Sequence, residues 1–309
     1  MSVGLYITNL VAIDESRESF EVAGYLIGKW QDPRLALPAG SGADQSAEQN
    51  SIREFRMEDI WSPPIQAANS ISHKTNSYSL EVDRNGNVTY VERFDAVLSN
   101  EYPLRTFPFD TQVLRLEFQP FRSTASGIEF AAQPLPSTGI DPDQHTDLAS
   151  WRMMDIRYTN EKVATGGAFP ETHEALFQIV VKRRFGFYIW KIFLPLLMMT
   201  IIPLIVFWID VKEFDWQLKI PMTMLLSMVA FEFAIARDLP KIGYVTFLDA
   251  VFLVSFAFCF LCTFEIAIVF LMQQRGLRPL AEKIHAAGRW AYPLAYFGSL
   301  VILALFFLI

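Results

Sequence analysis

Four long apolar segments in the second part of this 309-residue chain restrict its fold more than any other feature. They lie at about 187–209, 215–237, 247–272 and 288–309. Each is close to the ~20 residues that an α-helix needs to cross the hydrocarbon core of a bilayer. We therefore predict four membrane-spanning helices over residues 186–309, and a multi-pass protein of the cell membrane.

Charged residues are divided unevenly along the chain. Residues 1–185 carry 17 Lys/Arg and 25 Asp/Glu, a net charge of −8, whereas residues 186–309 carry 9 and 8, a net charge of +1. An acidic first part joined to an apolar second part excludes a single soluble globule, a disordered chain and a basic nucleic-acid-binding protein. The chain is therefore predicted to have two domains, with the boundary near residue 185.

The link between the third and fourth spans sets the predicted orientation. It is basic, with four cationic residues against Glu282: Arg275, Arg278, Lys283 and Arg289. By the positive-inside rule this link is cytoplasmic, which places residues 1–185 outside, in the periplasm or the extracellular space. No apolar signal-peptide core precedes the first strand-like run, so we expect that a leader has been removed.

Residues 1–185 show the alternation of apolar and polar residues that is typical of short β-strands. Residues 78–83, 114–119 and 177–182 alternate with a period of two, and Asn85-Gly86 is a strong hairpin signal. Regularly spaced short strands favour an antiparallel sandwich. The predicted fold class is a β + α membrane protein, with an extracellular β-sandwich over residues 1–185 followed by the four-helix domain.

The sequence contains no motif for catalysis or metal binding. Cys259 and Cys262 lie three residues apart inside an apolar span, and we interpret them as packing residues. The four histidines are scattered, and neither G-x-S-x-G nor H-E-x-x-H occurs. We predict a protein that is not an enzyme and has no cofactor or metal. A membrane-anchored enzyme and a membrane-anchored ligand sensor are the competing classes.

Polar and bulky residues of the second span fall on one side of a helix. They are spaced by four or three residues, which places them on one face: Lys219, Thr223, Leu226, Ala230, Phe233 and Arg237. Several copies of this helix around an axis would enclose a pore, with Leu226 and Phe233 as hydrophobic constrictions. A buried helix in a monomeric bundle is the alternative that the spacing leaves open.

Phe107-Pro108-Phe109-Asp110, followed by Gln112, resembles the core signature of the pentameric ligand-gated ion channels, the Cys-loop receptor family. Three further motifs resemble those of the family in the same order: Trp61-Ser62-Pro63, Leu194-Pro195 and Leu239-Pro240. The two loop cysteines of the family are replaced by Asn100 and Leu114, as in bacterial members. The likeness is greatest to the bacterial, amine-gated type.

This resemblance implies a homopentamer with an immunoglobulin-like extracellular sandwich, agonist sites between adjacent sandwiches, and a pore lined by the second span. The candidate agonist-binding residues are Phe121 and Tyr158 on the principal face, Tyr6 and Tyr25 on the complementary face, and Gln119 and Glu92. Aromatic rings attract ammonium groups. Because Gln66 and Gln119 replace acids of the amine-gated type, the expected agonist is a small molecule, an amine or another compound, or a proton.

The resemblance also identifies residues that couple agonist binding to the pore. Asp110 and Arg183 match a family pair at the end of the sandwich, and we expect a poorly solvated ion pair there. An exposed ion pair of small effect is the alternative. The other expected coupling residues are Phe107, Pro108, Phe109 and Pro240.

Ion selectivity is predicted from charges near the pore. Glu213 and Asp215 would form acidic rings at the cytoplasmic mouth, and the acidic extracellular half would concentrate cations. Lys219 argues for anions, because a ring of lysines in a narrow pore attracts them. We predict a channel for monovalent cations, with an anion-selective or a proton-gated channel as alternatives. The expected partners are further copies of the chain, the permeant cations, the agonist and the lipid bilayer, and no nucleic acid.

Overall fold

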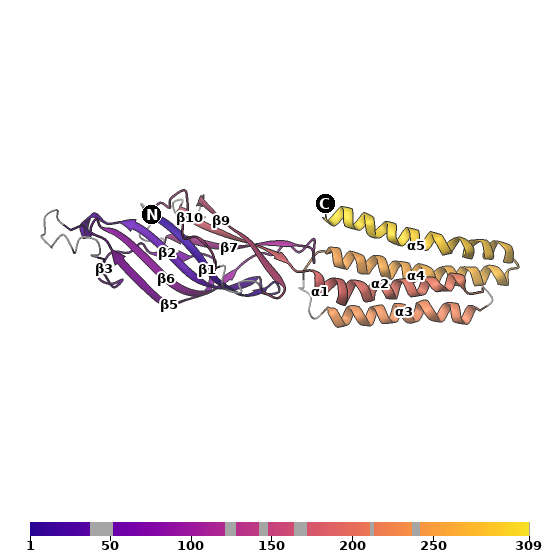
Figure 1. Cartoon of the computed structure of the whole chain (residues 1–309). Coiled ribbons are helices and arrows are strands. Elements are labelled where there is room, and N and C mark those ends of the chain that lie inside the picture. Colours follow the sequence, from indigo (N-terminus) through magenta and orange to yellow (C-terminus); the bar gives the residue numbers. More distant parts are fainter. Residues whose placement is uncertain are drawn as a thin grey trace. The chain divides into compact units, whose positions relative to one another are not determined.

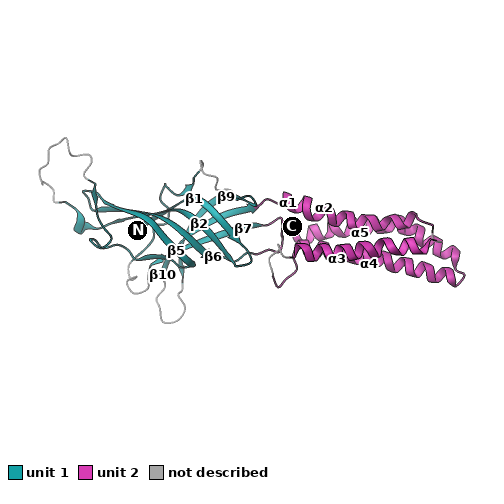
Figure 2. Ribbon diagram, turned by 90° about the horizontal axis from the view of Figure 1, so that it is seen from below, with its two compact units in different colours: residues 1–102, 111–182 teal, residues 103–110, 183–309 magenta. Residues whose placement is uncertain are grey.

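The computed structural model describes residues 1–37, 52–120, 128–141, 148–163, 172–210, 213–236 and 242–308 (Figure 1). Three residues of the predicted sites, Phe121, Arg237 and Pro240, lie outside these ranges. The chain forms two compact units (Figure 2). Unit 1 comprises residues 1–102 and 111–182, and unit 2 comprises residues 103–110 and 183–309. The loop with the Phe-Pro-Phe-Asp motif therefore belongs to the helical unit, although strands of unit 1 precede and follow it.

Unit 1 is a β-sandwich of two sheets. One sheet has the strand order β3-β5-β6-β2-β1-β8 and the other has the order β4-β7-β10-β9. The strands are β1 (Ser2–Asp14), β2 (Ser19–Gln31), β3 (Arg53–Glu54), β4 (Ile65–Ala67), β5 (Ser70–Val82), β6 (Asn87–Ser99), β7 (Thr111–Pro120), β8 (Gly139–Ile140), β9 (Trp151–Val163) and β10 (Thr172–Arg183). A short 3-10 helix, Pro33–Leu35, follows β2.

Alternation along the strands builds the core of unit 1. Leu5 and Leu26 are paired across β1 and β2, and both are buried. On the second sheet, Leu114 is paired with Ile179, and both face the core. The β5–β6 hairpin turns at Gly86, which has a φ of +77°, and a Cβ atom there would lie 2.4 Å from the carbonyl oxygen of Asp32. The Asn85-Gly86 turn signal thus marks a position where glycine is required.

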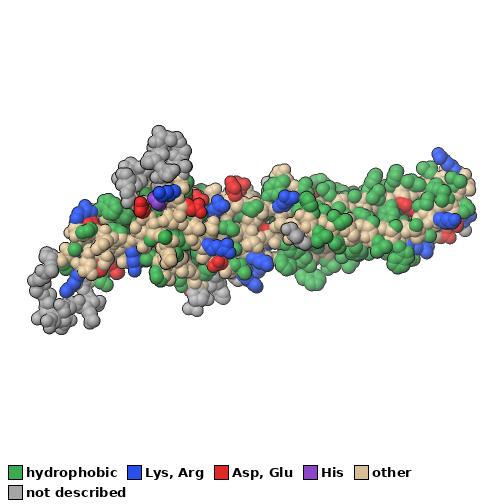
Figure 3. All heavy atoms as spheres, turned by 90° about the horizontal axis from the view of Figure 1, so that it is seen from above, with side chains coloured by type: hydrophobic (Ala, Val, Ile, Leu, Met, Phe, Trp, Pro, Cys, Tyr) green, Lys and Arg blue, Asp and Glu red, His purple; other side chains and the backbone are tan. Residues whose placement is uncertain are grey.

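Unit 2 contains four helical spans, each long and apolar enough to cross a membrane. The first span consists of α1 (Gly186–Tyr188), π-helical turns (Ile189–Phe193), α2 (Leu194–Ile201) and 3-10 turns (Ile202–Trp208). The others are α3 (Phe214–Ile235), α4 (Phe247–Gln274) and α5 (Arg278–Leu308). The π-helical turns immediately precede α2, where Pro195 lacks a backbone N–H. In Figure 3, hydrophobic side chains cover most of the visible face of the helical unit.

The last helix begins ten residues earlier than the sequence prediction of about residue 288. The segment before residue 288 is basic, so its hydropathy does not reveal it as part of a helix. Arg278 forms an i,i+4 ion pair with Glu282 at 3.2 Å, and Ala281 and His285 are buried. The predicted fold class, a β-sandwich followed by four membrane-spanning helices, is confirmed.

Candidate functional site

Tyr6 and Tyr25 lie side by side on the outer face of the six-stranded sheet. They are direct partners in the β1–β2 register, and Tyr25 is in turn paired with Arg93 of β6. The next row, with Leu5 and Leu26, points to the core, because successive residues of a strand face opposite sides. The two half-buried tyrosine rings thus form an aromatic surface, as the complementary face of an agonist site requires.

Glu92 faces the opposite side of the same sheet. It is paired with Leu26 in the β2–β6 register and is 6% exposed. Its carboxylate accepts hydrogen bonds from Thr75 and from the Tyr90 hydroxyl at 3.1 Å, and lies 2.9 Å from His73 Nε2. Burial opposes ionisation, but the bonds from His73, Thr75 and Tyr90 outweigh it and hold the pKa of Glu92 below its ordinary value. Within one chain, Glu92 is therefore separated from Tyr6 and Tyr25 by the sheet.

Gln119 lies on the outer face of the other sheet, where it meets an acid that the sequence reasoning missed. Its side-chain nitrogen donates to Glu174 Oε2 at 3.1 Å, and Gln66 is its register partner on β4. Glu174 is 6% exposed. Burial raises the pKa of Glu174 above its ordinary value; the bond from Gln119 opposes this shift, and the charges of Glu117 and Glu161 reinforce it. The β7–β10 pairing, which sequence alone does not reveal, creates this contact.

Tyr158, on β9, packs against the core rather than on the outer face. Its ring centroid lies 5.0 Å from that of buried Phe177, and its hydroxyl donates to the carbonyl oxygen of Ala131 at 2.9 Å. Burial raises the pKa of this hydroxyl. Phe121 is outside the described residues. The candidate agonist residues that the structure describes thus fall into separate groups within one chain and do not converge on one cavity.

Asp110 and Arg183 form a buried, two-pronged ion pair in unit 2. Arg183 Nε lies 2.7 Å from Asp110 Oδ1, and Nη2 lies 3.1 Å from Oδ2. The side chain of Arg183 is 3% exposed and that of Asp110 is 1% exposed. The guanidinium also lies 4.7 Å from the ring centroid of Phe107. This geometry is that of the desolvated pair and not of the exposed alternative.

The loop over residues 103–110 is tied to the helical spans by its other residues. The Phe109 ring contacts Phe185, Phe193 and Phe247, with centroid distances of 5.2, 6.1 and 5.8 Å. Phe107 packs edge-on against Tyr188 of α1 at 4.9 Å, and the Phe107–Pro108 peptide bond is cis.

Two backbone contacts join the loop to the segment that leads into α4. The Leu104 N–H donates to the Tyr244 hydroxyl at 2.9 Å, and the Phe247 N–H donates to the Arg105 carbonyl oxygen at 3.0 Å. Pro240, the contact expected from the sequence, lies outside the described residues. Tyr244 and Phe247 were not predicted, since no local pattern shows which residues of the linker the loop meets.

The face of α3 that was predicted to line a pore is exposed along its described length. We define the α3 stripe as the residues of this face: Asp215, Lys219, Thr223, Leu226, Ala230 and Phe233, all of which are exposed. Leu226 and Phe233 are 71% and 74% exposed. The Thr223 hydroxyl donates to the Lys219 carbonyl oxygen at 2.7 Å. Within one subunit this helix is therefore not the buried helix of a monomeric bundle.

Metal chemistry has no basis in the described parts of the chain. No group of three or more His, Cys, Asp or Glu side chains there is arranged to hold a metal ion. Cys259 and Cys262 are buried, unpaired residues of α4, and their sulfurs lie near the carbonyl oxygens of Met199 and Pro203.

The sequence matches the models of two domains of one protein family. Residues 1–185 match the neurotransmitter-gated ion-channel ligand binding domain, and residues 192–287 match the neurotransmitter-gated ion-channel transmembrane region. These matches cover most of the chain, which therefore belongs to the neurotransmitter-gated ion channels, the pentameric Cys-loop family. Because this is a family of channels and not of enzymes, the prediction of a non-enzymatic membrane protein is confirmed.

Curated relatives of this family are similar over almost the whole chain. The proton-gated ion channel of Gloeobacter violaceus is 26% identical over 312 residues, covering 99% of this chain and 83% of the relative. The glycine receptor subunit beta of Rattus norvegicus is 27% identical over 92% of this chain and 58% of the relative. The gamma-aminobutyric acid receptor subunit rho-1 of Mus musculus is 22% identical over 92% of this chain and 59% of the relative. The chain thus spans a little under three fifths of these two receptor subunits.

Proposed function

We propose that this chain forms a homopentameric, cation-selective channel that an extracellular agonist opens by binding between adjacent subunits. The exposed α3 stripe carries this proposal. In a lone subunit, Lys219 near the beginning of α3 and Thr223 one turn further would face lipid, although polar residues inside a membrane span usually face a protein interior or water. Copies arranged around an axis turn the same face toward water instead.

The contrast between α3 and α5 supports this role for α3. Both helices are largely exposed in one subunit. The exposed residues of the later part of α5 include Leu294, Val301, Ile302, Leu305 and Phe306, which suit lipid. The α3 stripe instead alternates charge, hydroxyl and bulky apolar groups, as expected of a pore with hydrophobic constrictions at Leu226 and Phe233.

The agonist site is proposed to lie between neighbouring sandwiches. One subunit supplies Tyr6 and Tyr25, and the next supplies Gln119 and Glu174 from the outer face of its four-stranded sheet. The family resemblance adds Phe121 and Tyr158 on that side, with Tyr158 packed against Phe177 of the core. Glu174 provides a carboxylate beside Gln119, where the amine-gated type has acids at positions 66 and 119. A carboxylate with aromatic rings suits an ammonium group, so a small amine is the agonist that this site favours.

A proton is the second candidate agonist. Glu174 is buried, and its raised pKa moves its titration toward neutral pH. One relative of the chain is described as a proton-gated ion channel. In this variant of the proposal, protonation of Glu174 replaces binding of an amine.

Cation selectivity rests on exposed acids at the beginning of α3 and on the −8 charge of residues 1–185. Glu213 and Asp215 are both exposed. The ammonium of Lys219 lies 5.6 Å from the ring centroid of Trp216, at the edge of the stripe, which draws this charge away from the proposed axis. An anion-selective pore is the alternative if Lys219 faces the axis.

For gating, agonist binding must favour the open state over the closed state. We propose that the agonist closes the segment near Tyr158 and turns the sandwich. Strands β6 and β7 carry this motion into the 103–110 loop, and its contacts with Tyr244 and Phe247 displace the linker between α3 and α4. Leu226 and Phe233 then tilt off the axis.

Recordings of purified protein in a planar bilayer test the proposal. Small amines and pH steps are applied in turn, and at least one of them is expected to evoke unitary currents. In asymmetric NaCl, these currents should reverse near the sodium potential. A shift toward the chloride potential would contradict cation selectivity. Silence under every condition, with intact protein that still binds an amine, would favour the membrane-anchored sensor.

Cysteine modification tests the pore lining. Thr223→Cys, on the α3 stripe, should be blocked by a cationic thiol reagent added to open channels. Leu294→Cys, an exposed position on α5, is the control and should not be blocked. Equal block of both variants, or of neither, would argue against the stripe as the pore lining.

A further inference from the structure

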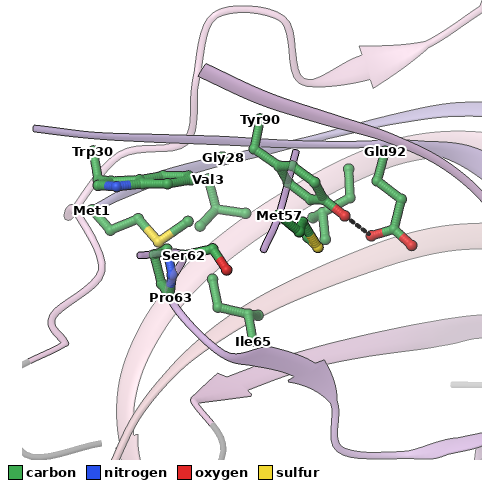
Figure 4. A pocket seen from close by; sticks show the side chains of 11 residues that line it. Met1, Val3, Gly28, Trp30, Met57, Ser62, Pro63, Ile65, Tyr90 and Glu92 are labelled. Carbon is green, nitrogen blue, oxygen red and sulfur yellow. Dashed lines mark hydrogen bonds between the residues drawn. The ribbon is translucent and has the colours of Figure 1, made fainter. Parts of the chain in front are cut away.

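Glu92 and Glu265, two buried acids of the chain, differ in how completely they are paired. Glu92 lines a small pocket of the β-sandwich (Figure 4), and three side chains contact its carboxylate through polar atoms. Glu265 of α4 is 8% exposed, and its Oε1 lies 3.3 Å from His285 Nδ1. Its Oε2 has no hydrogen-bond partner within the described parts of the chain. The incompletely paired acid therefore lies beside a buried histidine, and the proposed function uses neither.

His285 of α5 contacts a residue of each of the other three spans. Its ring centroid lies 5.4 Å from that of Phe207 in the first span, and its Nε2 lies 3.3 Å from Gln217 Nε2 of α3. Glu265 of α4 is the third contact. His285 is 2% exposed and Gln217 is 1% exposed. The imidazole thus joins α5 to the beginning of the helix that carries the α3 stripe.

The imidazole Nε2 has two neighbours that require opposite protonation states. Gln217 Nε2 donates to the carbonyl oxygens of residues 209 and 210 at 3.0 and 3.3 Å, which identifies it as the amide donor. It therefore needs a lone pair on His285 Nε2. The Val206 carbonyl oxygen, also 3.3 Å from Nε2, needs an N–H instead. Because Nδ1 faces the Glu265 carboxylate, the neutral imidazole carries its hydrogen there and offers Nε2 to Gln217.

A proton on Nε2 exchanges these bonds. Nδ1 of the charged imidazole still donates to Glu265, which pairs the buried charge, and Nε2 now donates to the Val206 carbonyl oxygen. The Gln217 amide then faces a donor and keeps only its bonds to residues 209 and 210. One proton thus detaches α5 from the beginning of α3 and ties it to the first span.

The other charges near the cluster are engaged elsewhere or exposed. Among the described residues, Glu265 is the one charged group within ion-pair distance of His285. Arg289 Nε of α5 donates to the Phe207 carbonyl oxygen at 2.7 Å. Three exposed acids and two further titratable groups complete the surroundings on the neighbouring segments: Asp210, Glu213, Asp215, Cys262 and Tyr292. The proton exchange is therefore assigned to the His285–Glu265 pair.

We propose that His285 is a positioning residue through which cytoplasmic protons modulate the channel. Protonation releases Gln217, frees the beginning of α3 to tilt and lowers the agonist concentration needed for opening. With the ligand-binding domain outside, the first span ends, and α3 and α5 begin, on the cytoplasmic side. The inference rests on the proposed function, in which α3 lines the pore, and adds control from the side of the membrane opposite to the agonist.

Hydrogen exchange of the full-length protein in detergent, without agonist, tests the bond exchange. Protection of the backbone amides of residues 214–222, corrected for intrinsic exchange, should fall about fivefold between pH 7.5 and pH 5.5, as loss of one hydrogen bond does. This step spans the range in which histidine ordinarily titrates. Equal protection at the two pH values would overturn the proposal.

Three variants assign the response. His285→Gln cannot take up the proton, and Gln217→Met cannot bond to the imidazole, so both should lose the pH response. His73→Gln makes the same change at the histidine beside Glu92 and should keep it. Gln217→Met decides the outcome if His285→Gln does not fold. A pH response that persists in folded Gln217→Met would overturn the role of His285.

Planar-bilayer recordings with separate baths test the modulation. The extracellular bath stays at pH 7.5 with butylamine as agonist, and the cytoplasmic bath is stepped to pH 5.5. The butylamine concentration for half-activation should fall about fivefold in the parent and stay constant in His285→Gln. An unchanged or higher concentration in the parent would overturn the modulation. Altered protection in a protein that passes no current would support the proton exchange and contradict only the proposed channel function.

Discussion

Two glutamates of the β-sandwich show how surroundings decide the charge of a residue. Glu92 and Glu174 are equally buried, yet their pKa values move in opposite directions. Three hydrogen-bonding partners stabilise the Glu92 carboxylate, whereas Glu174 has one bond from Gln119 and two acidic neighbours. Stability should therefore respond to pH with opposite signs at the two positions.

Glu92→Gln is expected to destabilise the protein at neutral pH. Because the folded-state pKa is lowered, the stabilisation from Glu92 is full above the unfolded pKa and is lost as pH falls through the folded pKa. The variant should lose about 1–3 kcal/mol at pH 7, the usual range for bonds to a charged group. Thermal unfolding from pH 3 to pH 8 measures this, with exposed Glu58→Gln as control. A loss that grows on acidification would contradict the assignment.

Glu174→Gln is expected to behave in the opposite way. The folded-state pKa of Glu174 is raised, so folding favours its protonated form. The stabilisation from Glu174 is therefore full below the unfolded pKa and is lost as pH rises through the folded pKa. The variant should therefore unfold at a higher temperature than the parent at pH 8, and the gain should vanish under acidic conditions. If the proton is the agonist, the same variant should also shift the pH of half-activation. A lower unfolding temperature at pH 8 would refute the burial argument.

The Asp110–Arg183 pair depends on both partners, because removing either leaves a buried charge unpaired. Asp110→Asn and Arg183→Ala should each cost about 3–5 kcal/mol and impair activation. Glu282→Gln breaks the exposed Arg278 pair and should cost less than about 0.5 kcal/mol. Unfolding temperatures and agonist-evoked currents provide the measurement. Normal activation in both junction variants would exclude the pair from coupling.

At the scale of elements, close packing places α5 against the 3-10 turns of the first span. Gly288 of α5 touches Phe207, and a Cβ atom there would lie 2.4 Å from Phe207 Cε1. Phe207 is fully buried and its ring cannot move aside freely. Gly288 thus sets how closely the two elements approach.

Gly288→Ala should destabilise the helical unit by about 1–3 kcal/mol, as overpacking of a core does. Gly298→Ala lies in the same helix with no atom within 4 Å of the added Cβ, and should be neutral or stabilising by up to ~1 kcal/mol. Detergent-solubilised thermal unfolding distinguishes the two. The same effect at both positions would mean that helix propensity, and not the Phe207 contact, determines the outcome.

At the scale of the whole molecule, the proposed function requires an assembly. One chain supplies only part of the proposed agonist site, and one α3 stripe cannot enclose a pore. Native mass spectrometry from a mild detergent should give a species of five times 35.3 kDa. A closed ring buries two different faces of each subunit against its two neighbours and leaves no open end. A monomer with full amine-evoked conductance, or a ring of a different number, would contradict the homopentamer.

The predictable part of this protein rests on local patterns. Apolar length predicts the four spans, alternation predicts strands, Asn85-Gly86 predicts a turn, and the Phe107–Asp110 motif identifies the family. The beginning of α5 escaped prediction, since the segment after Arg278 is amphipathic and charged. Contacts such as Asp110–Arg183 were expected only because a family resemblance supplied them.

The sequence by itself determined which segments enter the membrane, which form strands and which family the chain resembles, because these depend on neighbours within a few residues. The tertiary structure decided that Glu174 meets Gln119, that Glu92 faces a pocket behind Tyr25, and that the α3 stripe stays uncovered in one subunit. These outcomes depend on the register between strands far apart in the chain. A shift of one residue would turn each side chain to the other face of its sheet. Which distant strands pair, as β7 and β10 do, is decided by packing of the whole sandwich.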